Sequence, residues 1–152
     1  MSVSLIHNES HARLLLDSYQ RLLGKPLLAV DPARSLAQQL DVAGFVLLSH
    51  NTDNDPLFNY GNQQALALFE LTEDQLVQLP SRLSAEPVNQ QQRGVLLEQV
   101  RSKGYIIDYS GVRISRTGKR FLIQQAVVWN LLDEHGQYHG QAACFSDWTM
   151  VD

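Results

Sequence analysis

Hydrophobic residues recur every three or four positions near the start of the chain. Leu15, Tyr19 and Leu22 belong to this series, and charged residues occupy the opposite positions. This spacing gathers apolar side chains along one side of a helix. The pattern therefore predicts a helix over residues 10–23, which Gly24 ends.

Shorter patterns follow this helix. A second helix is predicted to open at Asp31-Pro32 and to run up to Gly44, because proline is tolerated in a first helical turn. After Gly44 the chain has two short apolar runs, separated by a loop rich in Asn, Asp and Pro. These runs predict strands at 45–48 and 57–60.

Three short helices are predicted next, each with its own start signal. Asn62 can cap the first helix, and Thr72 with Gln75 has the spacing of a capping box for the second. Asn89 with Gln92 repeats that spacing, which predicts the start of the third helix. Gly104 ends this third helix.

From residue 105 onward the pattern predicts three long antiparallel strands. Turns at 117–118 and 133–136 separate them, and the third strand is predicted over 138–148. Alternation in the first of these strands changes phase, which predicts a bulge near Gly111. In the second strand, the residues predicted to share one face are Phe121, Ile123, Val127 and Trp129.

This order of elements resembles that of PAS domains, in which two strands, several short helices and three antiparallel strands form one module. The chain is more closely similar to the MEKHLA domain family, whose members are PAS-like. The resemblance covers nearly the whole chain. It rests on Ser10-His11-Ala12, Leu48-Ser49-His50, Phe58-Asn59-Tyr60-Gly61-Asn62, Leu79-Pro80-Ser81-Arg82, Ala85-Glu86-Pro87, Tyr109-Ser110-Gly111-Val112-Arg113-Ile114-Ser115 and Val128-Trp129-Asn130.

The resemblance implies an α+β fold: a PAS-like five-stranded antiparallel sheet with short helices across one face, preceded by N-terminal helices. Residues 1–43 are then a helical extension that packs on the domain or dimerises it, and residues 44–152 form the PAS-like domain. A length of 152 residues suits one structural unit. The implied role is sensing or interaction, by analogy, because a fold alone does not determine function.

Composition narrows the classes of function. The net charge of −4 argues against a general nucleic-acid binder, although half of the 12 Lys and Arg residues fall within 101–120. Cys144 is the single cysteine, so the chain has no internal disulfide and fits a reducing compartment. No apolar run approaches the roughly 20 residues that a bilayer requires, and no signal peptide is evident. We expect a cytoplasmic protein without membrane contact.

No catalytic constellation is evident, so we expect a protein that is not an enzyme. The sequence lacks a nucleophile elbow and a phosphate-binding glycine loop, and its acidic residues are scattered. His50 with Asp53 and Asp55 could form an oxygen-rich cation site, but such strings are ordinary loop chemistry. His135 and His139 straddle a turn. We predict no metal site.

The resemblance also bears on cofactors. Light-sensing flavin relatives use a reactive cysteine in the helical segment, and haem-binding relatives use a histidine on the helix before the third strand. This chain has no cysteine between Asn62 and Gly104 and no histidine over 89–103. Noncovalent flavin, haem held by another ligand and an organic metabolite all stay open, so the cofactor is unknown.

A pocket beside the sheet is one candidate site. Polar amides interrupt apolar strands there, and small residues of one parity leave space, which is how a small-molecule site fixes orientation. Alternatively the amides point to solvent or tie strands to loops, the aromatic residues belong to the core, and Asn62 caps a helix. The pocket candidates are Tyr60, Asn62, Tyr109, Gln125, Trp129, Gln141 and Cys144.

A basic hairpin is the second candidate site. Its candidate residues for docking an acidic protein or nucleic acid are Arg113, Arg116, Lys119 and Arg120. The alternative is a solvated charged hairpin, because edge positions often carry Lys and Arg that prevent aggregation.

These observations predict a sensory or regulatory domain that binds a small molecule noncovalently and signals through a separate effector protein. The alternative is a ligand-free interaction module that uses the hairpin 113–120. The apolar stripe of the first helix either covers the sheet or pairs with a second copy, and we expect a homodimer.

Overall fold

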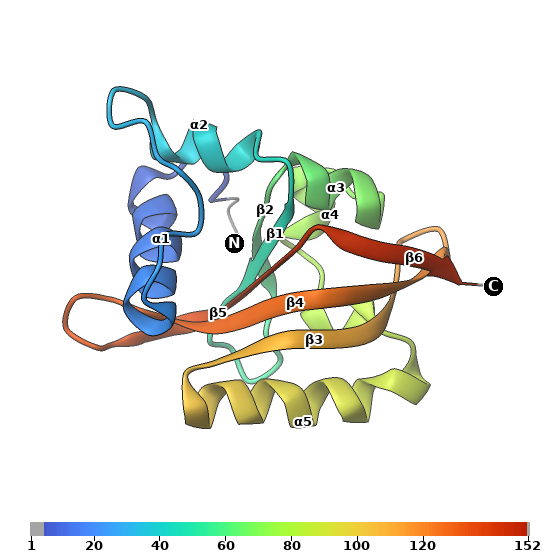
Figure 1. Ribbon diagram of the computed structural model, residues 1–152. Helices are drawn as coiled ribbons and strands as arrows, with labels where there is room; N and C mark the ends of the chain where they lie inside the picture. The colour runs from blue at the N-terminus through green and yellow to red at the C-terminus, as the bar shows by residue number, and fades with distance from the viewer. Residues whose placement is uncertain (1–4, 152) are drawn as a thin grey trace.

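The computed structural model describes residues 5–151, apart from the side chains of residues 87 and 88. An antiparallel sheet forms its centre (Figure 1). Its strands are β1 (Val46–His50), β2 (Phe58–Gly61), β3 (Tyr105–Ile114), β4 (Arg120–Leu132), β5 (Tyr138–Phe145) and β6 (Asp147–Val151). Five of them lie in the order β2-β1-β5-β4-β3, and β6 pairs with β4. The predicted five-stranded sheet is confirmed and gains one further strand.

Helices cover both faces of this sheet. They are α1 (Glu9–Leu23), α2 (Leu36–Asp41), α3 (Gln63–Phe69), α4 (Glu73–Leu76), a 3₁₀ helix (Ser81–Ser84) and α5 (Pro87–Lys103). Within the described residues, no helix is long and apolar enough to cross a membrane. Successive strand residues point to opposite faces. Leu47 accordingly packs with α1 and α2, whereas Leu48 packs with α3 and α4; α5 runs along β3 (Figure 1).

The first predicted helix is confirmed as α1. Asn8 caps it by accepting from the backbone N–H of His11, and Gly24 ends it in the left-handed region with φ 76°. Ala12, Leu15 and Tyr19 are buried against the sheet in one hydrophobic cluster. The apolar stripe of α1 therefore packs on its own chain, so it is not an open surface for a second copy.

The second helix begins later than predicted. α2 starts after Ser35 and not at Asp31-Pro32, because two side chains cap it there. The hydroxyl of Ser35 is one cap, and the carboxylate of Glu9, from α1, accepts from the backbone N–H of Ala37 at 2.7 Å. Because Glu9 is remote in sequence, local patterns did not reveal this start.

The capping box predicted at Asn89 and Gln92 is absent. α5 begins at Pro87 with Glu86 in the capping position, so Asn89 already lies inside the helix. Proline fits the first turn because its missing N–H would have no intrahelical partner.

A bulge in β4 changes the direction in which its side chains point. Gln125 has φ 54°, and the pairing of β3 with β4 shifts register beside it. Phe121 and Ile123 consequently pack with α3 and α4, whereas Val127 and Trp129 pack with α1. The prediction of one shared face is wrong, because a bulge inserts a residue and restarts the alternation.

The bulge predicted near Gly111 of β3 lies elsewhere in that strand. The extra residue of β3 lies between Ile106 and Tyr109, where Asp108 has φ 57°, whereas the shift between Tyr109 and Gly111 comes from the extra residue of β4.

The last strand is broken and not continuous over 138–148 as predicted. β5 ends at Phe145, and β6 begins at Asp147. β5 pairs with residues 127–132 of β4, and β6 pairs with residues 120–124 of the same strand. The chain therefore pairs with β4 twice, with the interruption at Ser146.

Candidate functional site

A cavity lies between the sheet and the helices α3 and α5. Its volume is about 60 Å³, counted as space open to the centre of a water molecule. A single water needs roughly 10–15 Å³ by this measure, so the cavity suits about four to six non-hydrogen atoms. Its apolar wall includes Leu48, Phe58, Phe69, Leu96, Ile123 and Phe145.

This cavity does not fit a flavin or a haem. Pockets for ligands of drug size or larger occupy roughly 300–1,000 Å³, several times the volume here. Its lining contains no cysteine, and His50 is its only histidine. The cofactor remains unknown, and the size of the cavity favours a much smaller molecule.

Two arginine side chains form part of the cavity wall. Arg93 of α5 donates from Nη2 to the hydroxyl of Ser81 at 2.8 Å. Arg113 of β3 donates to the Tyr109 hydroxyl at 3.1 Å and to the backbone carbonyl of Val112 at 2.9 Å. Both arginine residues are 8% exposed, so their guanidinium groups lie inside the protein.

The backbone of β3 explains why Arg113 points inward. A Cβ at Gly111 would lie 2.3 Å from the Tyr109 hydroxyl, so a larger residue there would displace the end of the Tyr109 side chain. Tyr109, Gly111 and Arg113 are spaced two apart and point to the same face. Arg113 therefore does not belong to the exposed basic hairpin, contrary to the sequence-based expectation.

His50 and Gln141 add further polar groups to the wall. His50 Nδ1 lies 3.0 Å from the carbonyl oxygen of Asn51, so Nδ1 is the donor. Its Nε2 is buried without a hydrogen-bond partner among the described residues, and burial lowers the pKa of the ring. The Gln141 amide donates to the carbonyl of Leu97 at 2.9 Å and to Asn130 Oδ1 at 3.2 Å, which fixes its orientation.

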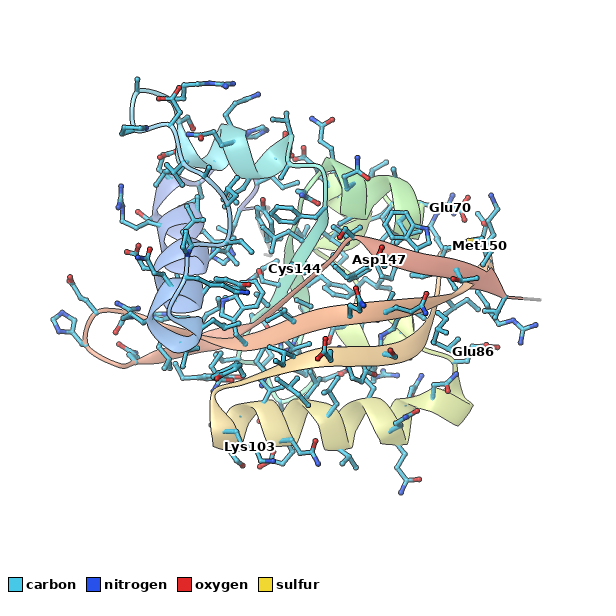
Figure 2. All side chains as sticks on the ribbon, viewed as in Figure 1. Glu70, Glu86, Lys103, Cys144, Asp147 and Met150 are labelled. Atoms are coloured by element: carbon cyan, nitrogen blue, oxygen red, sulfur yellow. The ribbon has the colours of Figure 1, made fainter. Side chains whose placement is uncertain are left out.

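The structure brings together only part of the predicted pocket. Tyr109 and Gln141 line the cavity. The others lie elsewhere: Tyr60, Trp129 and Cys144 pack on the face covered by α1, Asn62 starts α3, and Gln125 is exposed on the β4 bulge. Cys144 belongs to β5 (Figure 2), and burial raises the pKa of its thiol to about 12. It is therefore protonated at neutral pH and a poor nucleophile.

Asn62 has the structural role that was the alternative interpretation. It is fully buried, and its Oδ1 accepts from the backbone N–H groups of Leu47 and Ala65, both at 3.1 Å. Its Nδ2 donates to the carbonyl oxygens of Leu40 at 3.0 Å and Phe45 at 2.8 Å. One side chain thus joins the end of α2, strand β1 and the start of α3.

The remaining basic residues of the hairpin are exposed but interact with acidic neighbours. Lys119 Nζ lies 3.6 Å from Glu70 Oε2, and Arg120 Nη1 lies 3.8 Å from Glu86 Oε1. Arg116 donates to the backbone carbonyl of Glu70 at 3.1 Å. Figure 2 shows Glu70 and Glu86 near this end of the sheet. Part of the positive charge is therefore balanced within the chain.

Sequence reasoning missed Arg93 and assigned His50 only to a cation site. Among residues 5–151, no group of three His, Cys, Asp or Glu side chains could hold a metal ion. Asp55 instead forms an ion pair with Arg82 at 3.1 Å. Arg93 stands in a helix rich in polar residues, so no sequence signal distinguishes it from an exposed arginine.

A second histidine, His11, connects α1 to the sheet on the opposite face. Its Nε2 lies 3.0 Å from the hydroxyl of Ser49, and its ring lies 5.5 Å from that of Tyr60. Burial lowers the pKa of His11 to about 4, from an ordinary value of 6.5. The folded protein therefore resists protonation of His11 over a range in which the unfolded chain binds a proton.

This difference predicts that mild acid destabilises the fold. The unfolded chain binds more protons below pH 6.5, so stability is lost progressively as the pH falls from 6.5 to about 4. The loss attributable to His11 is about 3 kcal/mol, and His50 acts in the same direction. Urea unfolding at several pH values measures this slope. His11→Gln should reduce it, whereas His7→Gln, at an exposed position, should leave it unchanged; equal slopes in all three proteins would contradict the assignment.

Solved structures share this architecture. A PAS domain from Colwellia psychrerythraea matches with a TM-score of 0.65 at 12% identity, over 80% of this chain and 98% of that one. A light-oxygen-voltage domain studied with a flavin analogue matches with a TM-score of 0.61 at 16% identity, over 78% and 86%. The light-state dimer of the fungal photoreceptor Vivid gives 0.58 at 12% identity, over 85% and 91%. The chain has a PAS-like α+β fold, as predicted.

Sequence comparison gives the family. The MEKHLA domain model matches residues 9–150, and the chain belongs to the MEKHLA domain family. The homeobox-leucine zipper protein HOX9 of Oryza sativa subsp. indica is 29% identical over 145 residues, which cover 92% of this chain and 17% of that protein. ATHB-14 of Arabidopsis thaliana is 28% identical over 106 residues, or 68% of this chain and 12% of that protein. The chain thus spans less than a fifth of these relatives.

Proposed function

We propose that this domain is a sensory module, not an enzyme, that binds a small molecule noncovalently in the cavity and signals through contacts with other proteins. The cavity itself carries the proposal. Its walls are mostly apolar, and a few buried polar groups from Arg93, Arg113, His50 and Gln141 stand on them. This combination is characteristic of small-molecule sites, in which apolar surface supplies affinity and polar groups fix orientation.

The position of the cavity supports a signalling role. Arg93 and Leu96 bring α5 to one wall, and Ile123 and Ala143 bring the sheet to another. A ligand that contacts both walls would favour one arrangement of α5 on the sheet over another. A ligand shifts such an equilibrium only when it binds the two arrangements with different affinity. An output partner would then bind a surface whose shape depends on α5.

The homodimer expected from the sequence is retained as part of this proposal, but through a surface other than the stripe of α1. Vivid, which shares the fold, is described as a light-state dimer. In the present chain Leu15 and Tyr19 of α1 are buried on the sheet, so the dimer must use another face. Light scattering across a range of protein concentrations measures the oligomeric state. The cytoplasmic location expected from the sequence likewise stays a prediction.

A cavity-filling variant tests the proposed function. Ala143 lines the cavity, so Ala143→Leu should fill the space that a ligand needs. Ala33→Leu adds the same side chain at an exposed position and is the matched control. Native mass spectrometry and absorbance on protein purified directly from cells, followed by thermal shift with a metabolite collection, should detect a ligand for wild type and Ala33→Leu but not for Ala143→Leu.

A different result would favour the alternative function. If wild-type protein carries no bound molecule and no metabolite raises its melting temperature, the sensory proposal fails. The interaction module that uses Arg116, Lys119 and Arg120 would then be preferred. Ligand retention by Ala143→Leu would place the binding site outside this cavity.

A further inference from the structure

The cavity contains two positive charges without a compensating negative charge. Arg93 and Arg113 approach it from different elements, α5 and β3, and each is 8% exposed. Their hydrogen bonds go to hydroxyl groups and to a backbone carbonyl, which are neutral acceptors. A buried charge is costly unless a charge of opposite sign pairs with it.

The acidic residues nearby are paired with other cations. Asp55 pairs with Arg82 at the surface and attracts Arg93 only from beyond ion-pair distance, and Glu86 pairs with Arg120. Among the described residues, no carboxylate lies within 4 Å of a nitrogen of Arg93 or Arg113. Burial, and next the charge of Arg113, lower the pKa of Arg93 to about 10. The two guanidinium groups therefore repel each other across a shared space.

A third polar group in the cavity also lacks a partner. Nε2 of His50 is buried on the wall without a hydrogen bond, and the residue is only 7% exposed. Since Nδ1 donates to Asn51, Nε2 of the neutral ring is an acceptor, so a donor such as water or a hydroxyl group would satisfy it and a carboxylate would not. His50 stands at the end of β1, on the cavity face that Arg93 also reaches.

Four residues of the wall connect the cavity to the surface. Arg93, His50, Leu97 and Gln141 line both the cavity and a larger groove beside the loop 51–56. The groove is also lined by the charged residues Asp53, Asp55, Arg82, Glu98 and Arg101, so Arg93 stands between these surface charges and the cavity.

The geometry points to a small monocarboxylate of about four to six non-hydrogen atoms, held in this cavity by Arg93 and Arg113 with its short chain against the apolar wall. This inference rests on the proposed function and names its ligand class. The planar guanidinium matches a carboxylate through two parallel hydrogen bonds. Phe58, Ile123 and Phe145 offer an apolar surface for a short aliphatic chain, which an inorganic anion lacks.

Propionate is the probe that tests the inference, and propionamide is its neutral counterpart of nearly the same shape. Both are titrated into the full chain at constant ionic strength, and binding is followed by NMR shifts and calorimetry. We expect propionate to bind at least tenfold more tightly than propionamide and than inorganic phosphate. Arg93→Met and Arg113→Met should each weaken propionate at least tenfold. Arg116→Met, an exposed arginine outside the cavity, should change it less than twofold.

A stability measurement separates binding from structural roles. If Arg93 and Arg113 bind a ligand and do not stabilise the fold, the Arg93→Met and Arg113→Met variants should have melting temperatures equal to or above that of ligand-free wild type. Each substitution removes a buried charge that lacks an ion-pair partner. Melting well below the wild type would assign them a structural role and overturn the inference.

The remaining outcomes distinguish this inference from the proposed function. Equal binding of propionate and propionamide would overturn the anion requirement and leave the sensory function in place. Tighter binding of phosphate would replace the carboxylate by an inorganic anion. If none of the three probes binds, the inference fails. If protein purified from cells is also free of any molecule and no metabolite raises its melting temperature, the proposed function fails with it.

Discussion

Replacing Gly140 with alanine should lower the free energy of unfolding by at least about 4 kcal/mol. Gly140 has φ 123°, which side chains of L-residues rarely adopt, and a Cβ there would lie 2.0 Å from the carbonyl oxygen of His50. Because the contact is with backbone, rotation of a side chain cannot relieve it. The end of β1 would have to separate from β5, with which it pairs.

Gly136 provides the matched control for this variant. It also has a positive φ, of 79°, but a Cβ there would meet nothing within 4 Å. Gly136→Ala should therefore cost about 1 kcal/mol, from backbone strain alone. Urea unfolding followed by tryptophan fluorescence measures both variants. Similar losses for Gly140 and Gly136 would show that the close approach of His50 contributes nothing to the penalty.

Replacing Asn62 with alanine should cost about 3–4 kcal/mol, because it combines the loss of a helix cap with buried groups left unpaired. The variant removes the acceptor for the N–H groups of Leu47 and Ala65 and the donor for the carbonyls of Leu40 and Phe45. Asn62 is 0% exposed, so bulk solvent does not reach these four groups directly. The loss should appear as a lower urea midpoint.

Gln64→Ala is the control for Asn62→Ala. Gln64 lies in the same helix, α3, and is exposed, so its replacement should change stability by less than about 0.5 kcal/mol. A small loss in Asn62→Ala would mean that neighbouring side chains satisfy the four backbone groups. In that case Asn62 would again be a candidate for a role outside the fold.

The sequence was sufficient where the determining signal is local. The helix α1 follows from its apolar stripe and from Gly24, and the capping box of Thr72 with Gln75 forms as its spacing predicts. The order of strands and helices along the chain followed from the hydrophobic pattern, and the MEKHLA resemblance of that order is confirmed by the family match over residues 9–150. These features depend on residues within a few positions of one another, or on whole-chain similarity.

Other features depend on contacts between distant segments. The start of α2 is set by Glu9, which lies on α1 and binds the N–H of Ala37. The bulge at Gln125 is not marked by a glycine or proline, so the change of face in β4 had no local signal. An alternating pattern is informative only as long as no residue is inserted, and one insertion reverses every later assignment.

The candidate site shows the same division. Tyr109 and Gln141 could be predicted as pocket residues from the strand patterns. Those patterns did not show which face of each strand lies toward the helices. Arg93 and Arg113 could not be predicted as cavity residues, because arginine is almost always at the surface and their burial depends on the packing of distant segments. A bulge was predicted near Gly111, although the extra residue of β3 lies between Ile106 and Tyr109, and the role of Gly111 in admitting the Tyr109 side chain depends on packing that no local pattern shows.

Because of the bulge at Gln125, side chains of the same parity in the two halves of β4 face different environments. Before it, Ile123 forms part of the cavity wall; after it, Trp129 lies under α1, with its ring 5.0 Å from that of Tyr19. Slippage of β4 by one residue would exchange these environments, turning the indole toward the cavity and emptying the space under α1. The inserted residue thus fixes the alignment of β4, and the backbone of this one strand connects the cavity wall to the surface under the N-terminal helix.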